Sequence, residues 1–194
     1  MATAAHSPQM TVEEFLTLPE DGVDRELVGG EVRERGPSIH SMLHASCLAE
    51  LAYLIGNWSH AHPSSGVEVL AGQPGFIMQR EPPTVVGPDF AVVDADVTTD
   101  PRYGLVEGVP RLAVEIISPS DNQGDIHDKV RLYLDHGIAG VWVVDPVDQC
   151  VQIYRAGQPV MLFSGEQLLT CEPELPGFSV HVSELFRYVK GGRA

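Results

Sequence analysis

Three side chains of the sequence, Asp89, Glu115 and Lys129, are of types that could together hydrolyse a phosphodiester bond. Asp89 begins an apolar run that reads as a strand. Glu115 stands in the middle of another, where the period of two in a strand gives it the same face as Ala113 and Ile117. An ionised Glu buried without a partner is costly, so Glu115 implies a cation or a hydrogen-bonding network beside it. Either a metal or a salt bridge would serve.

Two carboxylates on neighbouring strands are typical of a site for Mg²⁺ or Mn²⁺, hard ions that take oxygen ligands and keep waters for a phosphate and a nucleophile. Lys129 lies at the start of a predicted helix, close enough in sequence to Glu115 for a loop to bring it over the strand. Its ammonium could orient the nucleophile and stabilise charge on the phosphoryl group. This set of residues predicts a metal-dependent phosphodiesterase site.

Each of these side chains also has an ordinary structural interpretation. Asp89 could only cap a turn before its strand. Glu115 could form a structural ion pair with Arg111 or Lys129. Lys129 has the i, i+4 spacing of a helical pair with Asp125, worth about 0.2–0.5 kcal/mol. Taken singly, Asp89 and Lys129 favour the structural interpretation and Glu115 favours neither, so the prediction depends on the ordered set.

Helices that pack against the strands must help to position these residues. A helix over 42–58 is predicted because apolar residues recur there at spacings of three and four. A second helix is predicted over 125–136, with Asp125 as its N-cap and Gly137 just past its end. A short capped helix is predicted over 11–18.

Several segments rich in β-branched and aromatic residues, bounded by Pro, Gly and Asp, are predicted strands. They are 67–70, 75–79, 89–93, 111–117, 140–145, 151–154 and 159–163. A hairpin is predicted over 25–32, where two glycines allow a tight turn. Because a strand, helix, strand passage normally joins parallel strands, we expect an α/β or mixed α+β fold with a mixed central sheet flanked by helices.

The composition predicts a single domain. A chain of 194 residues that is 43% hydrophobic can bury one core, expected over 11–189, with frayed ends at 1–10 and 190–194. No apolar run approaches the roughly 18 residues of a membrane span, and the first residues do not resemble a signal peptide, so we expect a soluble, cytoplasmic protein without membrane partners. Three widely separated cysteines indicate reduced thiols.

The formal net charge of −15 opposes nucleic-acid binding, because such binders usually neutralise phosphates with Lys and Arg. Screening over about 8 Å at physiological salt leaves room for a local basic or metal-loaded cleft. The charge therefore indicates weak DNA binding. It also keeps two alternatives open, a catalytically dormant nuclease-fold binding module and a phosphodiesterase for small nucleotides.

Other motifs in the sequence point to no further chemistry. His40 and His44 have the spacing of a zinc pair, but the Glu of H-E-x-x-H is absent and no third ligand follows nearby, so zinc is not predicted. The acidic stretch 94–100 lacks the Gly of a calcium loop and is expected to be a solvated loop. A P-loop, a G-x-S-x-G motif and a dinucleotide fingerprint are all missing from the sequence.

Ordered motifs between about Val12 and Phe186 resemble those of a known family. They are Glu26-Leu27-Val28 with Gly30-Glu31, a loose Pro37-Ser38 with His40, Pro88-Asp89, Val114-Glu115-Ile116-Ile117-Ser118-Pro119-Ser120, Asp125 with Lys129 and Tyr133, and Gly140-Val141-Trp142-Val143-Val144-Asp145-Pro146. Together they resemble the Uma-two family of predicted restriction endonucleases, which belongs to the PD-(D/E)XK nuclease superfamily. The spacing of the whole set is more specific than any one motif.

The resemblance implies a restriction-endonuclease-like core and roles for several of the motif residues. Asp89 and Glu115 would be metal ligands, with the backbone carbonyl of Ile116 as a third. The superfamily's usual Lys position, two residues after the Glu, holds Ile117 here, so Lys129 would be a migrated catalytic lysine.

Two further residues receive roles from the same resemblance. Glu26 would be a third catalytic carboxylate, although it could instead be a surface acid paired with Arg25 or Arg33, and His40 could contact phosphate or water. The implied activity is a Mg²⁺- or Mn²⁺-dependent endonuclease that hydrolyses DNA by attack of metal-bound water. A homodimer is expected, because two sites related by a two-fold axis can cut both strands of a duplex.

Overall fold

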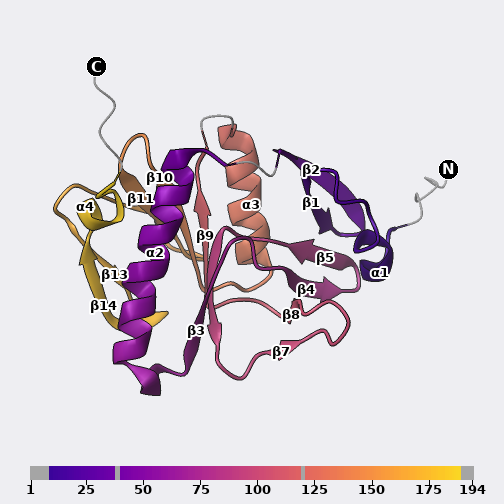
Figure 1. Cartoon of the computed structure of the whole chain (residues 1–194), viewed down its shortest axis with the longest axis horizontal. Coiled ribbons are helices and arrows are strands. Elements are labelled where there is room, and N and C mark those ends of the chain that lie inside the picture. Colours follow the sequence, from indigo (N-terminus) through magenta and orange to yellow (C-terminus); the bar gives the residue numbers. More distant parts are fainter. Residues whose placement is uncertain (1–8, 38–39, 119–120, 189–194) are drawn as a thin grey trace. The chain divides into compact units, whose positions relative to one another are not determined.

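The computed structural model of the protein describes residues 9–37, 40–118 and 121–188 (Figure 1). These residues form two compact units whose segments alternate along the sequence. The first unit contains 9–37, 75–87 and 98–108, and the second contains 40–74, 88–97 and the described residues from 109 onward. No helix in the described ranges is long and apolar enough to cross a membrane.

Most of the two ends predicted to be frayed, residues 1–8 and 190–194, lies outside the described residues. Gln9 and Met10, at the inner edge of the N-terminal segment, are held by hydrogen bonds. The Gln9 amide donates to the Gly29 carbonyl at 3.0 Å, and the Met10 backbone N–H donates to the Gly30 carbonyl at 3.0 Å.

The first unit contains one helix and a six-stranded sheet. Its elements are α1 (Val12–Phe15), β1 (Val23–Val28), β2 (Glu31–Pro37), β4 (Phe76–Arg80), β5 (Pro83–Val86), β7 (Thr98–Thr99) and β8 (Val106–Glu107), and the strand order is β2-β1-β5-β4-β8-β7. The predicted hairpin is confirmed as β1 and β2, and both Gly29 and Gly30 have positive φ. The predicted capped helix is also present, closed by a capping box between Thr11 and Glu14, but it is a single short turn.

The second unit holds the larger core. Its elements are α2 (Met42–Ala61), the 3₁₀ turn η1 (Pro63–Ser65), β3 (Val67–Ala71), β6 (Phe90–Asp94), β9 (Leu112–Ile116), α3 (Gln123–Asp135), β10 (Gly140–Asp145), β11 (Cys150–Tyr154), β12 (Met161–Ser164), β13 (Leu168–Cys171), β14 (Leu175–His181) and α4 (Val182–Leu185). A six-stranded sheet has the order β12-β11-β10-β9-β6-β3, and β13 pairs with β14. Strands β9 and β10 are parallel and are joined by α3, which confirms the predicted crossover and mixed sheet.

The strand period divides the six-stranded sheet into two faces. Leu112, Val114 and Ile116 of β9 pack in one buried cluster with Leu51 and Ile55 of α2. The intervening residues of β9 therefore point to the other face, toward α3 (Figure 1). Glu115 therefore lies on the α3 face of the sheet.

The start of α3 differs from the prediction. Asp125 is not the N-cap but lies in the first turn. The cap is Asn122, whose side-chain oxygen accepts a hydrogen bond from the Asp125 N–H at 2.9 Å. Asn and Asp both serve as caps, so residue type alone did not distinguish Asp125 from Asn122. The predicted end is confirmed, with Gly137 at φ 90° just after the helix.

The strand predictions missed five strands, namely β5, β7, β8, β13 and β14. β5 begins at the second of two adjacent prolines, Pro83, and β7 and β8 have two residues each, so none shows an alternating pattern. β14 contains Pro176 and Gly177, which argue against a strand from sequence. It nevertheless supplies Leu175 and Phe178 to the core beside α2.

Candidate active site

Glu115 lies on the α3 face of β9 and is 5% exposed. Its oxygen Oε2 accepts a hydrogen bond from Lys129 Nζ at 2.9 Å, and Oε1 accepts one from the Tyr133 hydroxyl at 2.5 Å. The carboxylate thus has both a cationic and a neutral donor in the low-dielectric interior. Burial of this charge is compensated as the sequence required.

Lys129 and Tyr133 are one helical turn apart and therefore reach the same carboxylate from one face of α3. The loop after β9 does bring Lys129 back over the strand, as its position predicted. Ile117, at the superfamily's usual Lys position, instead donates its N–H to the Val144 carbonyl at 2.8 Å. Arg111, the alternative partner of Glu115, forms an ion pair with Asp94.

Asp89 lies at the end of β6 nearest Glu115 in the strand register. β6 and β9 are antiparallel with Phe90 opposite Val114, so the next position along each strand brings Asp89 and Glu115 to the same end of the pair. Asp89 is 6% exposed, and its Oδ2 accepts a hydrogen bond from the Ile116 N–H at 2.8 Å. This bond fixes the carboxylate across the two strands.

Two histidines near the start of α2 complete the surroundings of Asp89. His44 is 3% exposed, and its Nε2 lies 3.1 Å from Asp89 Oδ2. The exposed His40 ring stacks on the His44 ring with centroids 4.1 Å apart. One ligand atom from each of His40, His44 and Asp89 falls within 4.8 Å of the other two, an arrangement that could hold a metal ion.

Sequence reasoning missed His44 as part of this site. The third potential ligand beside the histidine pair is Asp89, which is distant from both histidines in sequence and so forms no local motif with them. Tyr133 was also given no role, although its i, i+4 spacing from Lys129 predicts a shared helix face. That spacing was the available signal.

Glu26 lies on β1, in the first unit. It is 3% exposed, and its Oε2 accepts a hydrogen bond from Arg35 Nε at 2.6 Å. Arg35 is thus an ion-pair partner of Glu26, whereas Arg25 pairs with Asp21 at 2.8 Å. The role of Glu26 as a third catalytic carboxylate stays a prediction.

The donor atoms around Asp89 and Glu115 fit a divalent cation. Carboxylate oxygens suit Mg²⁺ and Mn²⁺, and imidazole nitrogens favour Mn²⁺ and later transition metals over Mg²⁺. In the described structure, His44 Nδ1 is buried without a hydrogen-bond partner, so this ring is not held in place by the usual second bond. The site thus combines buried carboxylates, imidazoles and one ammonium, a set suited to hydrolysis at phosphorus.

Comparisons with known proteins give matches over most of the chain. The model of a family described as "Uma2: Putative restriction endonuclease" matches residues 12–183. A solved structure, described as a putative nuclease belonging to DUF820 from Anabaena variabilis, is similar over 93% of this chain and 99% of that one, with 20% identity and a TM-score of 0.76. At this identity the likeness shows the fold, and it confirms the predicted fold class.

A DrdV–DNA complex is a more remote match, with 12% identity and a TM-score of 0.33 over 62% of this chain and 12% of that one. No protein with a curated description matched the chain.

Proposed function

Because the chain belongs to the Uma2 family of restriction-endonuclease-like proteins, we propose that it is a metal-dependent endonuclease that hydrolyses phosphodiester bonds in DNA. The proposed centre is Asp89, Glu115 and Lys129 in the second unit. The observation that carries the proposal is the contact of 2.9 Å between Lys129 Nζ and Glu115 Oε2, on a strand whose neighbour presents Asp89.

This contact matters because it supplies the cation that the strand itself lacks. Ile117 cannot act as the superfamily lysine, so the cation beside Glu115 comes from Lys129 on α3. Lys129 is only 15% exposed, so its ammonium is directed at the carboxylate rather than into solvent. A desolvated ammonium exerts a stronger field on a transferring phosphoryl group than a surface one does.

Asp89 and Glu115 would hold the ion, with the Ile116 carbonyl as a further oxygen ligand and with His44 and His40 on the Asp89 side. When bound, a divalent ion lowers the pKa of coordinated water and polarises a phosphoryl oxygen. The imidazoles lead us to expect that Mn²⁺ binds more tightly than Mg²⁺.

The protein's own groups would orient the reaction. Lys129 and Tyr133 each donate to a different oxygen of Glu115, which fixes the rotation of the carboxylate. The Ile116 N–H and His44 Nε2 both contact a single oxygen of Asp89, Oδ2, which holds that oxygen in place. Lys129 would also stabilise the negative charge that develops on the phosphoryl group in the transition state.

The acidic composition limits how DNA would be bound. Most of the Lys and Arg side chains in the described structure pair with carboxylates, so few can neutralise phosphates. We therefore propose weak binding to DNA, aided by the metal-loaded centre. A homodimer would place two such centres on one duplex, and sedimentation of the purified protein would test it.

Cleavage assays test the proposal. Purified protein with Mn²⁺ or Mg²⁺ is expected to cut plasmid or linear DNA, and Asp89→Ala, Glu115→Ala and Lys129→Met are expected to reduce the rate by about a hundredfold or more. Glu68→Gln, on an exposed position of β3, is the matched control and should retain activity.

Substrate panels separate the alternatives. Cleavage of cyclic or linear dinucleotides but not of DNA would identify a small-nucleotide phosphodiesterase. Intact plasmid, linear and single-stranded DNA, RNA and dinucleotides over a broad metal titration would instead support the dormant binding module and contradict the proposal.

A further inference from the structure

Strand β12 lies at one edge of the six-stranded sheet of the second unit, beside β11. Three consecutive apolar residues at this edge are exposed, Val160 by 52%, Met161 by 39% and Leu162 by 60%. Together with Leu168 they make up four of the ten large hydrophobic residues that are exposed in the described structure. Single exposed apolar residues are ordinary, but a run of them on a sheet edge is typical of an interaction surface.

The backbone of β12 presents hydrogen-bonding groups along its outer side. The Ser164 N–H donates to the Gln167 side-chain oxygen at 2.7 Å, and the Ser164 carbonyl accepts from the Gln167 N–H at 3.2 Å. Both backbone groups of Ser164 therefore point away from β11. This direction alternates along an antiparallel strand, so Leu162 and Val160 also turn their N–H and C=O outward. Among the described residues β12 ends the strand order, and no further strand meets these groups.

Natural proteins protect sheet edges with charged side chains, and other edge strands of this protein follow that rule. β2, an edge of the sheet in the first unit, has charged residues at four of its seven positions. β3, at the opposite edge of the sheet that contains β12, carries the exposed Glu68. In contrast, the sequence has no charged residue between Arg155 and Glu166. The β12 edge thus lacks the usual protection against pairing with another strand.

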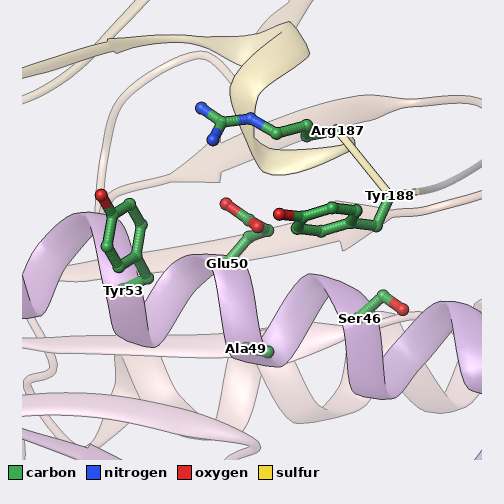
Figure 2. A pocket seen from close by; sticks show the side chains of 6 residues that line it. All are labelled: Ser46, Ala49, Glu50, Tyr53, Arg187 and Tyr188. Carbon is green, nitrogen blue, oxygen red and sulfur yellow. The ribbon is translucent and has the colours of Figure 1, made fainter.

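Other exposed aromatic residues of the second unit lie beside charged side chains. Tyr53 and Tyr188 stand next to Glu50 and Arg187 around a pocket on α2 (Figure 2). The Arg187 side chain is half exposed and would have to lose water beneath an apolar partner, which is unfavourable. The β12 edge imposes no such cost on a partner.

The charge of the protein favours a second copy of the chain as that partner. Two copies that each carry a net charge of −15 repel one another, so they can approach closely only where charged residues are missing. A basic partner would instead be attracted to the acidic surface and would gain nothing from an uncharged edge. The edge is also self-complementary, because two identical antiparallel strands related by a two-fold axis give each outward donor an acceptor.

We propose that β12 pairs with β12 of a second copy, antiparallel across a two-fold axis at Met161. In this register Val160 of each copy faces Leu162 of the other, and their outward backbone groups form the ladder. The groups of Ser164 are not needed, since they are already used in the turn with Gln167. The inference deepens the proposed function, because it rests on the homodimer proposed there and names its interface, and it does not require the metal centre.

Pro159 is compatible with this pairing. Proline has no N–H to donate, and an interior proline would interrupt a ladder. By the same alternation, however, Pro159 is out of phase with the outward positions Val160 and Leu162, so its missing donor does not face the second copy. The exposed apolar side chains of both copies would lose contact with water when the strands pair.

Sedimentation velocity of the full chain tests the interface. At about 1–100 µM the wild type is expected to shift from a mass of 21.0 kDa toward twice that mass. Leu162→Lys is expected to weaken dimerisation at least about tenfold, because an ammonium on the edge opposes pairing. Its unfolding midpoint should not change, since Leu162 is exposed. Val147→Lys introduces the same charge at an exposed apolar position between β10 and β11 and should dimerise as the wild type does.

Disulfide trapping tests the register. Met161 of the two copies would form a non-hydrogen-bonded pair with Cα atoms about 4.5 Å apart, a separation that a disulfide can span. Met161→Cys in a Cys150→Ser background is therefore expected to give a covalent dimer under mild oxidation, while the remaining Cys47 and Cys171 are buried. Val147→Cys in the same background should stay monomeric on a denaturing gel.

These measurements separate failure of the interface from failure of the proposed cleavage. Asp89→Asn should dimerise as the wild type does, whether or not the protein cleaves DNA. A wild type that stays monomeric over the whole concentration range would overturn both the homodimer and this interface. A dimer that Leu162→Lys leaves equally tight, or equal cross-linking of Met161→Cys and Val147→Cys, would overturn the interface alone.

Discussion

At the scale of single residues, the burial of Glu115 depends on donors that come from one helix face. Lys129 and Tyr133 each bind a different oxygen of this carboxylate, which is 5% exposed. The need for a cation near Glu115 was predictable from an acid within an apolar strand. The imidazole of His44 was not, because a contact between residues far apart in sequence leaves no local pattern. The Tyr133 hydroxyl was indicated only by its i, i+4 spacing from Lys129.

Tyr133→Phe should therefore destabilise the protein. The change removes one donor from a buried, charged acceptor, and we expect the free energy of unfolding to fall by about 1–3 kcal/mol. Tyr154→Phe is the matched control, since the Tyr154 hydroxyl donates to the neutral amide of Gln152 at 2.5 Å and should matter less. Urea denaturation measures both. An equal loss in the two variants would mean that the Tyr133 hydroxyl does little for Glu115.

The Cys47 thiol should make stability depend on alkaline pH. Burial, together with the charges of Asp145 and Glu50, raises the pKa of this thiol from 9.0 to about 12. The unfolded chain then releases the proton first, so this contribution to stability is complete below pH 9.0 and is lost as the pH rises toward 12. Urea denaturation at about pH 8 and about pH 11 should show a smaller decline for Cys47→Ser than for the wild type. An identical decline would contradict a buried, neutral thiol.

At the scale of elements, the parts of the fold with strong periodicity were predictable. α2, the β9-α3-β10 crossover and the hairpin of β1 and β2 follow from spacing and turn residues. The short strands of the first unit and the pair of β13 and β14 could not be predicted from spacing and turn residues, because their pairing depends on partners remote in sequence. The site nevertheless lies on predictable elements, which is why its carboxylates were identifiable.

Gly140, the first residue of β10, allows a test of how closely this strand packs against Glu174. A Cβ on Gly140 would meet Glu174 Oε1 at 2.9 Å, and Glu174 is held in place by Arg155 at 2.7 Å. Gly140→Ala is thus expected to lower the free energy of unfolding by about 1–3 kcal/mol.

Gly56→Ala is the matched control for Gly140→Ala. Gly56 lies within α2 and a Cβ there meets nothing within 4 Å, so this change should raise stability by about 0.5–1 kcal/mol. Thermal unfolding distinguishes the two changes, and stabilisation by both would show that Glu174 can move aside.

At the scale of the whole molecule, the net charge of −15 determines how this protein can meet DNA. The composition alone predicted that the net charge opposes DNA binding. The structure adds that cations such as Arg35 and Arg155 are engaged in buried or half-buried ion pairs. A bound divalent ion at Asp89 would offset local negative charge where a phosphate must approach. Metal and DNA should therefore bind cooperatively.

Fluorescence anisotropy with labelled DNA measures this coupling. Lys129→Met is used as a background in which cleavage is suppressed, and Mn²⁺ is expected to increase its affinity for DNA. Combining Asp89→Asn with Lys129→Met should remove the increase in DNA affinity, because the carboxylate that attracts the ion is gone. A fall in affinity on addition of Mn²⁺ would mean that the ion only competes for phosphates.

Calorimetric titration of Mn²⁺ into the full-length protein tests the metal centre most directly. We expect the wild type to bind Mn²⁺, Asp89→Asn and Glu115→Gln to lose that binding, and Glu68→Gln to retain it. Absence of binding to the wild type at millimolar Mn²⁺, or unchanged binding in Asp89→Asn and Glu115→Gln, would contradict a metal-dependent centre built on these two carboxylates.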